Sequence, residues 1–223
     1  LGIFAYSYQG SKMELEQEVQ ETTATPVSGK VIVVDAGHGI PDEGAESSSG
    51  TTEAETNLKI ALKLQNILEQ SGSTVILTRS DENAIYDLDK NTLREKKISD
   101  IRNRVKIGNN SSADIFVSIH LNKIPQQQYW GWQCFYNSGN EKSMDLAKKI
   151  QSNLNDAIQK ENKRVAMKLD TVYIMKHVEI PISIVECGFL SNPEEEQQLL
   201  DDEYQDKLAW GIYNGITDYF NEN

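Results

Sequence analysis

Two of the three histidines in this chain of 223 residues follow short apolar runs. His38 lies between two glycines just after VIVV, residues 31–34, and His120 directly follows IFVSI, residues 115–119. A lone histidine at a strand end is more often structural, but two at equivalent strand ends indicate a shared metal ion. A catalytic Zn²⁺ takes three protein ligands and keeps one position open. The segment around His38 lacks the GxGxxG spacing of a dinucleotide loop.

The third ligand of such a site should be a nearby anion. Glu53 is the best candidate, because it begins the helical pattern that follows the strand of His38. Glu55 is the competing carboxylate, about 200° around the helix from Glu53 at ~100° per residue. Acidic residues in the first turn of a helix also simply complement its dipole. The residues alone therefore favour Glu53 without excluding Glu55.

Glu186 ends the apolar run ISIVE, residues 182–186, and is followed by CGF. A carboxylate in this position is either a buried salt-bridge partner or a catalytic acid and base. Burial would raise its pKa toward neutrality, which a proton shuttle requires. His177 precedes the same run, so we expect it at the opposite end of that strand or in a loop folded over the site. It is either a surface histidine or a residue that orients substrate.

The elements that must position these residues follow from the apolar spacing. Short β-branched or aromatic runs predict strands at 31–34, 74–78, 115–119, 132–136 and 182–186. Apolar residues at helical spacing predict helices over 53–70, 98–108, 144–158 and 208–220. The acidic stretch 193–203 is interpreted as a loop running into the last helix.

This alternation predicts a single α/β domain with a mostly parallel central sheet and helices on both faces. Ligands bind such sheets beyond the carboxyl ends of the strands. His38, His120 and Glu186 each end a predicted strand, so we expect them to share one rim of the sheet.

Composition excludes some classes of function. The formal net charge is −12, from 22 basic and 34 acidic residues, which disfavours nucleic acid as a partner. Cys134 and Cys187 are 53 residues apart (187 minus 134) and form no CxxC pair. We expect two buried free thiols, with a single disulfide as the alternative in an oxidising compartment.

The first 29 residues differ from the rest of the chain. Residues 1–29 combine a mildly apolar start with a polar stretch, and no apolar run reaches the ~18 residues of a spanning helix. We interpret this segment as a polar spacer or the remnant of a trimmed export signal or anchor. The catalytic domain is then residues 30–223, and we expect an exported protein of the cell envelope.

Five short motifs together resemble the zinc-dependent N-acetylmuramoyl-L-alanine amidases of the amidase 3 family. They cover residues 30 to 220 in the family order: DAGHG (35–39), GTTEAETNL (50–58), TRSD (78–81), SIHLN (118–122) and VECGFLSN (185–192). Each motif is weak alone, and their order makes the resemblance specific. The stretch SIHLNKIP followed by WGWQCFYN is most similar to the CwlD-like branch, whose members act in making the spore cortex.

The resemblance implies one Zn²⁺ held by His38, Glu53 and His120, with Glu186 as the catalytic glutamate. It selects Glu53 over Glu55, because the ligand opens the E-x-[DE]-x-N-L string. It also implies a twisted sheet wrapped by helices. Two departures from the family pattern are Ile40, where relatives often have glycine, and Ala54, where many have lysine.

The implied reaction is hydrolysis of the amide between N-acetylmuramic acid and L-alanine in peptidoglycan. In the cortex, removal of the peptide would precede formation of muramic δ-lactam. We expect Asn122 and Trp132 to contact substrate, with turn geometry and core packing as their structural alternatives. Trp130 is a weaker candidate for the same aromatic wall, and Arg79 is expected to be a salt-bridge partner.

Two rival functions stay open at this point. One is a zinc peptidase that cuts within the stem peptide, and the other is a catalytically idle, metal-dependent peptidoglycan-binding scaffold. A site with one carboxylate and two imidazoles could bind zinc only modestly. A protein partner in the envelope could then support zinc loading by ordering the loops of His38 and Glu53. The oligomeric state does not follow from the sequence.

Overall fold

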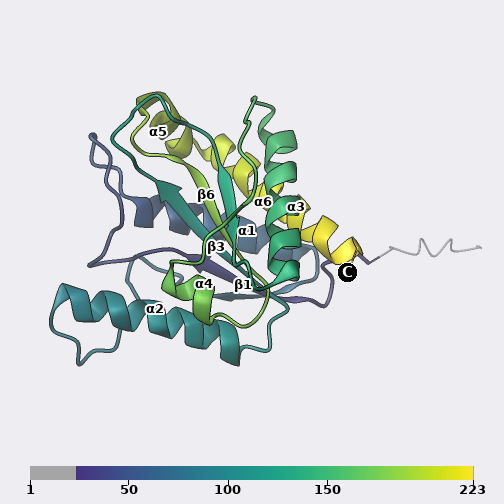
Figure 1. Ribbon diagram of the computed structural model, residues 1–223, viewed down its shortest axis with the longest axis horizontal. Helices are drawn as coiled ribbons and strands as arrows, with labels where there is room; N and C mark the ends of the chain where they lie inside the picture. Colours follow the sequence, from purple (N-terminus) through teal and green to yellow (C-terminus); the bar gives the residue numbers. More distant parts are fainter. Residues whose placement is uncertain (1–23, 223) are drawn as a thin grey trace, which may run out of the picture.

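A six-stranded sheet forms the centre of the molecule, whose computed structural model describes residues 24–222 (Figure 1). The strand order is β2-β1-β3-β6-β4-β5. β1, β2, β3 and β6 are mutually parallel, whereas β4 runs antiparallel to β6 and β5 is parallel to β4. The strands are β1 (Val31–Ala36), β2 (Thr74–Leu77), β3 (Ile115–Asn122), β4 (Gln133–Tyr136), β5 (Met167–Lys168) and β6 (Ile182–Phe189).

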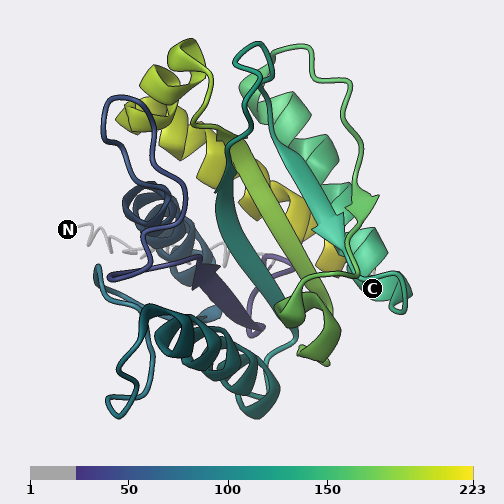
Figure 2. The same cartoon turned by 60° about the vertical axis from the view of Figure 1, so that its left-hand side comes forward.

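Helices cover both faces of this sheet, as predicted (Figures 1 and 2). One face packs against α1, α3 and α6 in the larger core, and the other packs against α2 and α4 in a smaller one. The helices are α1 (Glu53–Gln70), α2 (Leu93–Asn110), α3 (Glu141–Ile158), α4 (Tyr173–His177), α5 (Pro193–Leu200) and α6 (Asp202–Glu222). The mostly parallel α/β architecture predicted from the sequence is confirmed.

Helix starts are set by local capping groups that the sequence displays. The Thr52 side chain accepts a hydrogen bond from the Glu55 N–H, so α1 begins at the predicted Glu53. Thr92 and Glu95 form a reciprocal capping box at the start of α2. These caps matter for the site, because the first places Glu53 in the opening turn of α1.

Three segments differ from the sequence-based expectations. Residues 193–200 are helical rather than a loop, because the Asn192 side chain caps α5 and Pro193 occupies its first turn. The short α4 and β5 were not predicted. Val27 is fully buried in the larger core, so folded structure extends a few residues before Lys30. The proposed spacer, residues 1–29, falls mostly outside the described residues.

Strand alternation decides which side chains face which layer. Phe116, Ile182 and Ile184 belong to the smaller core beneath α2 and α4. His120 and Glu186 continue the same alternation along β3 and β6, and they are paired neighbours across these two strands. Both side chains therefore project on the α2 side of the sheet, past the end of its helical cover.

Cys134 and Cys187 are buried free thiols, which confirms the first interpretation. Within the described residues, no helix is long and apolar enough to cross a membrane.

Candidate metal centre

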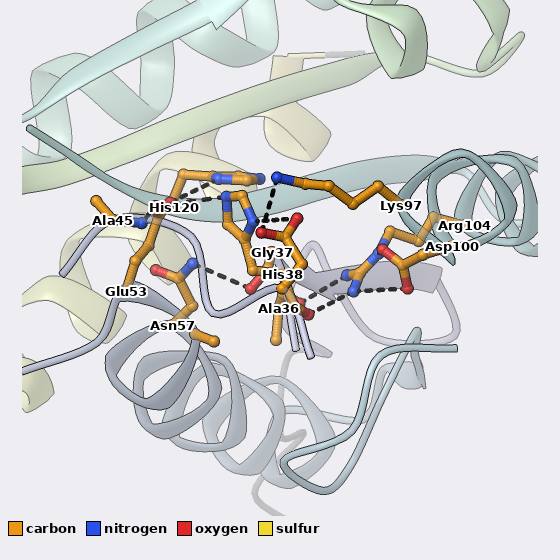
Figure 3. Close-up of polar contacts among 12 residues, drawn as sticks. Ala36, Gly37, His38, Ala45, Glu53, Asn57, Lys97, Asp100, Arg104 and His120 are labelled. Carbon is orange, nitrogen blue, oxygen red and sulfur yellow. Dashed lines mark hydrogen bonds and ion pairs between the residues drawn. The ribbon is translucent and has the colours of Figure 1, made fainter. Parts of the chain in front are cut away.

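The structure brings His38, Glu53 and His120 together from three segments of the chain (Figure 3). One ligand atom of each lies within 4.8 Å of the other two. His38 follows β1, Glu53 opens α1, and His120 lies near the end of β3. His38 takes a left-handed backbone conformation, with φ at 63°, which turns its imidazole toward the rim.

Two glycines leave the room that these side chains occupy. A Cβ atom added at Gly37 would lie 2.3 Å from the His120 ring, and one at Gly44 would lie 2.5 Å from Glu53 Oε2. Gly44 also has a φ of 73°, which disfavours any other residue. Gly37, before His38 in DAGHG, is thus needed because a side chain there would clash with the His120 ring.

Glu53 is held between the two imidazoles by the backbone around it. Its Oε2 accepts the Ala45 N–H at 2.9 Å and its Oε1 accepts the Leu121 N–H at 3.1 Å. Oε1 is 2.9 Å from His120 Nδ1, and Oε2 is 3.4 Å from His38 Nε2. Burial alone would raise the pKa of Glu53, but the two histidines hold that pKa well below its usual range. The carboxylate is therefore ionised and ready to bind a cation.

Glu55 points away from this centre. Its side chain is exposed and pairs with Lys59, one helical turn on, at 2.7 Å. The structure thus supports Glu53 as the carboxylate of the cluster.

Asp42 orients His38 from the side opposite to Glu53. Its Oδ2 is 3.3 Å from His38 Nδ1, and its Oδ1 is 2.9 Å from Lys97 Nζ. Burial would lower the pKa of His38, but Asp42 and Glu53 raise it to about 9. A carboxylate on the far nitrogen of a histidine is the usual arrangement around a ligand imidazole, because it fixes the tautomer and the ring. The sequence did not reveal this role for Asp42.

Glu186 is the acid and base candidate of the cluster. Burial, with a smaller contribution from Glu53, raises the pKa of Glu186 to about 7 against the opposing effect of His120 and His38. Its Oε2 is buried and has no hydrogen-bond partner among the described residues. Glu186 is therefore not the salt-bridge partner that was its structural alternative.

A cavity of about 370 Å³ adjoins the cluster on the α2 side of the sheet. His38, His120 and Glu186 line one end of it, and Lys97 and Asp42 lie beside them. Its remaining wall is largely aliphatic: Ile101, Leu169, Val172, Ile174 and Ile184. The histidine pair and the carboxylate therefore face a space that a substrate can enter.

The donor set fits Zn²⁺. Two imidazoles and one ionised carboxylate converge, which is a recognised catalytic set for zinc, and hard cations such as Mg²⁺ prefer oxygen ligands throughout. Beside this set, the buried Oε2 of Glu186 has no hydrogen-bond partner among the described residues, as expected for a site that activates water. The residues present thus match the group that the sequence predicted.

Two buried arginines support the segment that carries His38. Arg79 donates to the carbonyls of Ala36, Gly37 and Ala54 rather than to a carboxylate, so its expected role as a salt-bridge partner was wrong. Arg104 forms the ion pair instead, at 2.6 Å from Asp35, and also donates to the His38 carbonyl. Arg79 belongs to a sequence motif, whereas no motif in the sequence indicates the role of Arg104.

The other predicted contacts have different outcomes. Trp132 is fully buried in the larger core and its indole N–H donates to Asn155, so the expected substrate contact is wrong and core packing is correct. Asn122 ends β3, where its backbone pairs with Phe189, and its substrate contact stays a prediction. His177 is exposed on α4 and stacks on Tyr173, away from the cluster.

Comparison with known proteins identifies the family. The family model described as N-acetylmuramoyl-L-alanine amidase, Amidase_3, matches residues 32–218. The chain belongs to this family. A germination-specific N-acetylmuramoyl-L-alanine amidase of Bacillus subtilis is 36% identical over 220 residues, which cover 99% of this chain and 90% of the relative.

Solved structures of amidases share the fold. The CwlD amidase of Clostridioides difficile, solved in complex with the GerS lipoprotein, has a TM-score of 0.85 and 43% identity, covering 87% of this chain and 100% of that one. An N-acetylmuramoyl-L-alanine amidase of Clostridium difficile 630 has a TM-score of 0.77 and 30% identity, covering 88% and 99%. The resemblance to CwlD-like amidases seen in the motifs is confirmed.

Proposed function

We propose that this amidase is a zinc enzyme that hydrolyses the bond between N-acetylmuramic acid and L-alanine in peptidoglycan. The observation that carries the proposal is the Oε2 of Glu186, which is buried without a hydrogen-bond partner among the described residues, beside two imidazoles and a carboxylate. The family match supports the bond that is cut. A binding scaffold would have no use for Glu186, a carboxylate in the cavity wall whose pKa is raised to about 7.

In this proposal, His38, Glu53 and His120 hold one Zn²⁺, which supplies a Lewis acid for the amide carbonyl and for the attacking water. Asp42 and the Ala45 and Leu121 N–H groups keep the ligands oriented. Glu186 accepts a proton from the water as it attacks the carbonyl carbon. It then donates that proton to the nitrogen of L-alanine as the C–N bond breaks, so one carboxylate serves as base and acid.

We place the reaction in maturation of the spore cortex, where the freed lactyl carboxyl would be the substrate for lactam formation by a second enzyme. The 36% identity to a germination-specific amidase supports this setting. It also supports export to the cell envelope, with residues 1–29 as a spacer or the remainder of a signal or anchor. The boundary of the catalytic domain near Lys30 belongs to the same proposal.

We propose further that an envelope protein supports metal loading. The CwlD amidase of known structure was solved with a lipoprotein. In this chain His38 lies on the loop after β1, and the loop that leads to Glu53 is contacted by Lys123, which donates to the Glu46 carbonyl. Zinc content of the isolated chain measures the need for a partner, and a fully loaded, active isolated chain would remove it.

The direct test compares metal-stripped and zinc-loaded protein on peptidoglycan. Zinc should restore release of stem peptide, and mass spectrometry should find a free L-alanine amine and an intact peptide. Cleavage inside the peptide would instead identify a peptidase. Glu186→Gln should lower kcat by about 100-fold or more while zinc stays bound, the range expected for loss of a general acid and base. Glu55→Gln is the matched control, because Glu55 lies outside the cluster.

Retention of near-normal kcat in Glu186→Gln would overturn its role. Glycan binding with no turnover in zinc-loaded wild-type protein would favour the scaffold.

A further inference from the structure

The cavity beside the metal cluster has two chemically different parts. Ile101, Leu169, Val172, Ile174 and Ile184 form an aliphatic wall. A glycan strand would leave its hydroxyl groups against this wall without partners, which is costly for buried polar groups. A short peptide with a small apolar side chain suits it better.

Lys97 is the cation at the cluster end of this cavity. Figure 3 shows its side chain extended toward the two imidazoles. Its Nζ lies 2.9 Å from Asp42 Oδ1, and the side chain is 50% exposed. An ammonium group has three donors, so one carboxylate partner leaves donors for a ligand.

The other basic side chain of the cavity is already committed. Arg104 is 2% exposed and forms ion pairs with Asp35 and Asp100. The molecule as a whole carries a formal charge of −12 and repels anions. Apart from the metal that the cluster would hold, an anionic group that enters this cavity meets Lys97 as its available cationic partner.

We propose, on the basis of the amidase function above, that Lys97 binds the free α-carboxylate of the second residue of the stem peptide. That residue is a D-glutamate joined through its side-chain carboxyl, so its α-carboxylate is free unless it is amidated. L-alanine and the following peptide lie along the aliphatic wall, and the glycan lies outside the cavity. Lys97 thereby selects the acid form of the stem peptide over the amidated form.

The spacing of these groups suits this arrangement. The α-carboxylate carbon is five bonds from the scissile nitrogen, a reach of roughly 6 Å for an extended backbone. Lys97 is separated from the ligand His38 by one side chain, since Asp42 contacts both. A substrate amide at the cluster can therefore bring its carboxylate to Lys97 without leaving the cavity.

The test uses two soluble muropeptides that differ only at this group, one with D-glutamate and one with its α-amide, D-isoglutamine. Wild-type enzyme should favour the acid in kcat/KM by roughly 10-fold, the effect of one charge-assisted hydrogen bond, and mainly through KM. Lys97→Gln should bring the ratio of the two kcat/KM values close to one. Lys106→Gln, the same change on the exposed face of α2, should keep the wild-type ratio.

Other outcomes would overturn the proposal. If the ratio of the two kcat/KM values is near one in wild-type enzyme, no cation of the site distinguishes the carboxylate from the amide. An equal loss on both substrates in Lys97→Gln shows that Lys97 acts only by holding Asp42 against His38.

A binding measurement separates this proposal from the amidase function. The released peptide is titrated, in acid and amide forms, into zinc-loaded Glu186→Gln and into Glu186→Gln with Lys97→Gln added. Tighter binding of the acid only when Lys97 is present supports the proposal even if neither muropeptide is cleaved. Equal binding of the two forms overturns the proposal. If the acid form binds more tightly but wild-type enzyme cleaves neither muropeptide, the amidase function alone is overturned.

Discussion

At the scale of single residues, the site depends on a buried ion pair that does no chemistry. Asp35 accepts hydrogen bonds from Thr78 at 2.7 Å, Ser118 at 2.5 Å and Arg104 at 2.6 Å. Arg104 in turn donates to the carbonyl of His38, so the pair ties β1 and α2 to the ligand loop. Removing one partner of a buried pair is costly, because the other charge is left uncompensated.

Asp35→Asn should therefore lower the free energy of unfolding by about 3 kcal/mol at pH 7. Burial would raise the pKa of Asp35, but Arg104 and the two hydroxyls hold it below 3.8. The contribution of the ionised carboxylate is thus complete above the unfolded pKa and is lost as pH falls through the folded pKa. Urea unfolding at pH 7 and pH 3 should show a smaller gap between variant and wild type at pH 3.

Asp89→Asn is the matched control for this change. Asp89 is exposed and, among the described residues, its side chain pairs with neighbouring Lys90, so the loss should be under about 1 kcal/mol at either pH. A gap between Asp35→Asn and wild type that did not change with pH would contradict the assigned ionisation.

At the scale of elements, close packing of α6 on α3 supports the sheet that carries the cluster. α6 presents Gly215 to the backbone of α3, where an added Cβ would lie 2.4 Å from Ile150 Cα. Ile150, Leu154, Ile212 and Ile216 are all fully buried around this crossing. The approach of the two helices therefore depends on the missing side chain.

Gly215→Ala should lower the free energy of unfolding by about 2 kcal/mol, despite the higher helix propensity of alanine. The atoms that would clash are backbone atoms of α3, so the helices must move apart. Chemical denaturation measures the change. Gly139→Ala is the control, because a Cβ there meets nothing within 4 Å. A Gly215→Ala protein as stable as wild type would show that the two helices can separate without loss.

At the scale of the whole molecule, the cluster joins parts of the chain that are distant in sequence. His38 follows β1, Glu53 begins α1 and His120 lies near the end of β3. The three residues meet only in the folded state. An ion that binds there selects the folded protein over the unfolded chain.

Zinc should therefore stabilise the chain, by about 2.7 kcal/mol at a free concentration 100 times the Kd. Thermal unfolding of chelator-treated protein should show a Tm that rises with added zinc. Magnesium at the same concentration should have little effect, because it prefers oxygen ligands. His120→Ala should lose the zinc response, and a wild-type Tm that ignores zinc would contradict the site.

Short-range sequence patterns predict the alternation of strands and helices and the rim of the sheet at which the site residues lie. The predicted helix over 53–70 agrees with α1, since Thr52 caps its start and SGS follows its end. His38, His120 and Glu186 were placed together because parallel strands end at one edge. These features depend on local capping and on the direction of the strands, and both can be predicted from short stretches of sequence.

The surroundings of that rim depend on tertiary packing, which these patterns do not predict. Cys134 on β4 and Trp132 just before this strand both belong to the larger core, which forms where β4 pairs with β6. Lys97 reaches Asp42, and Arg104 reaches the His38 carbonyl, because α2 crosses the sheet near the end of β1. Short-range spacing does not encode such contacts, between residues 55 (97 minus 42) and 66 (104 minus 38) positions apart, since they arise from how α2 packs on the finished sheet.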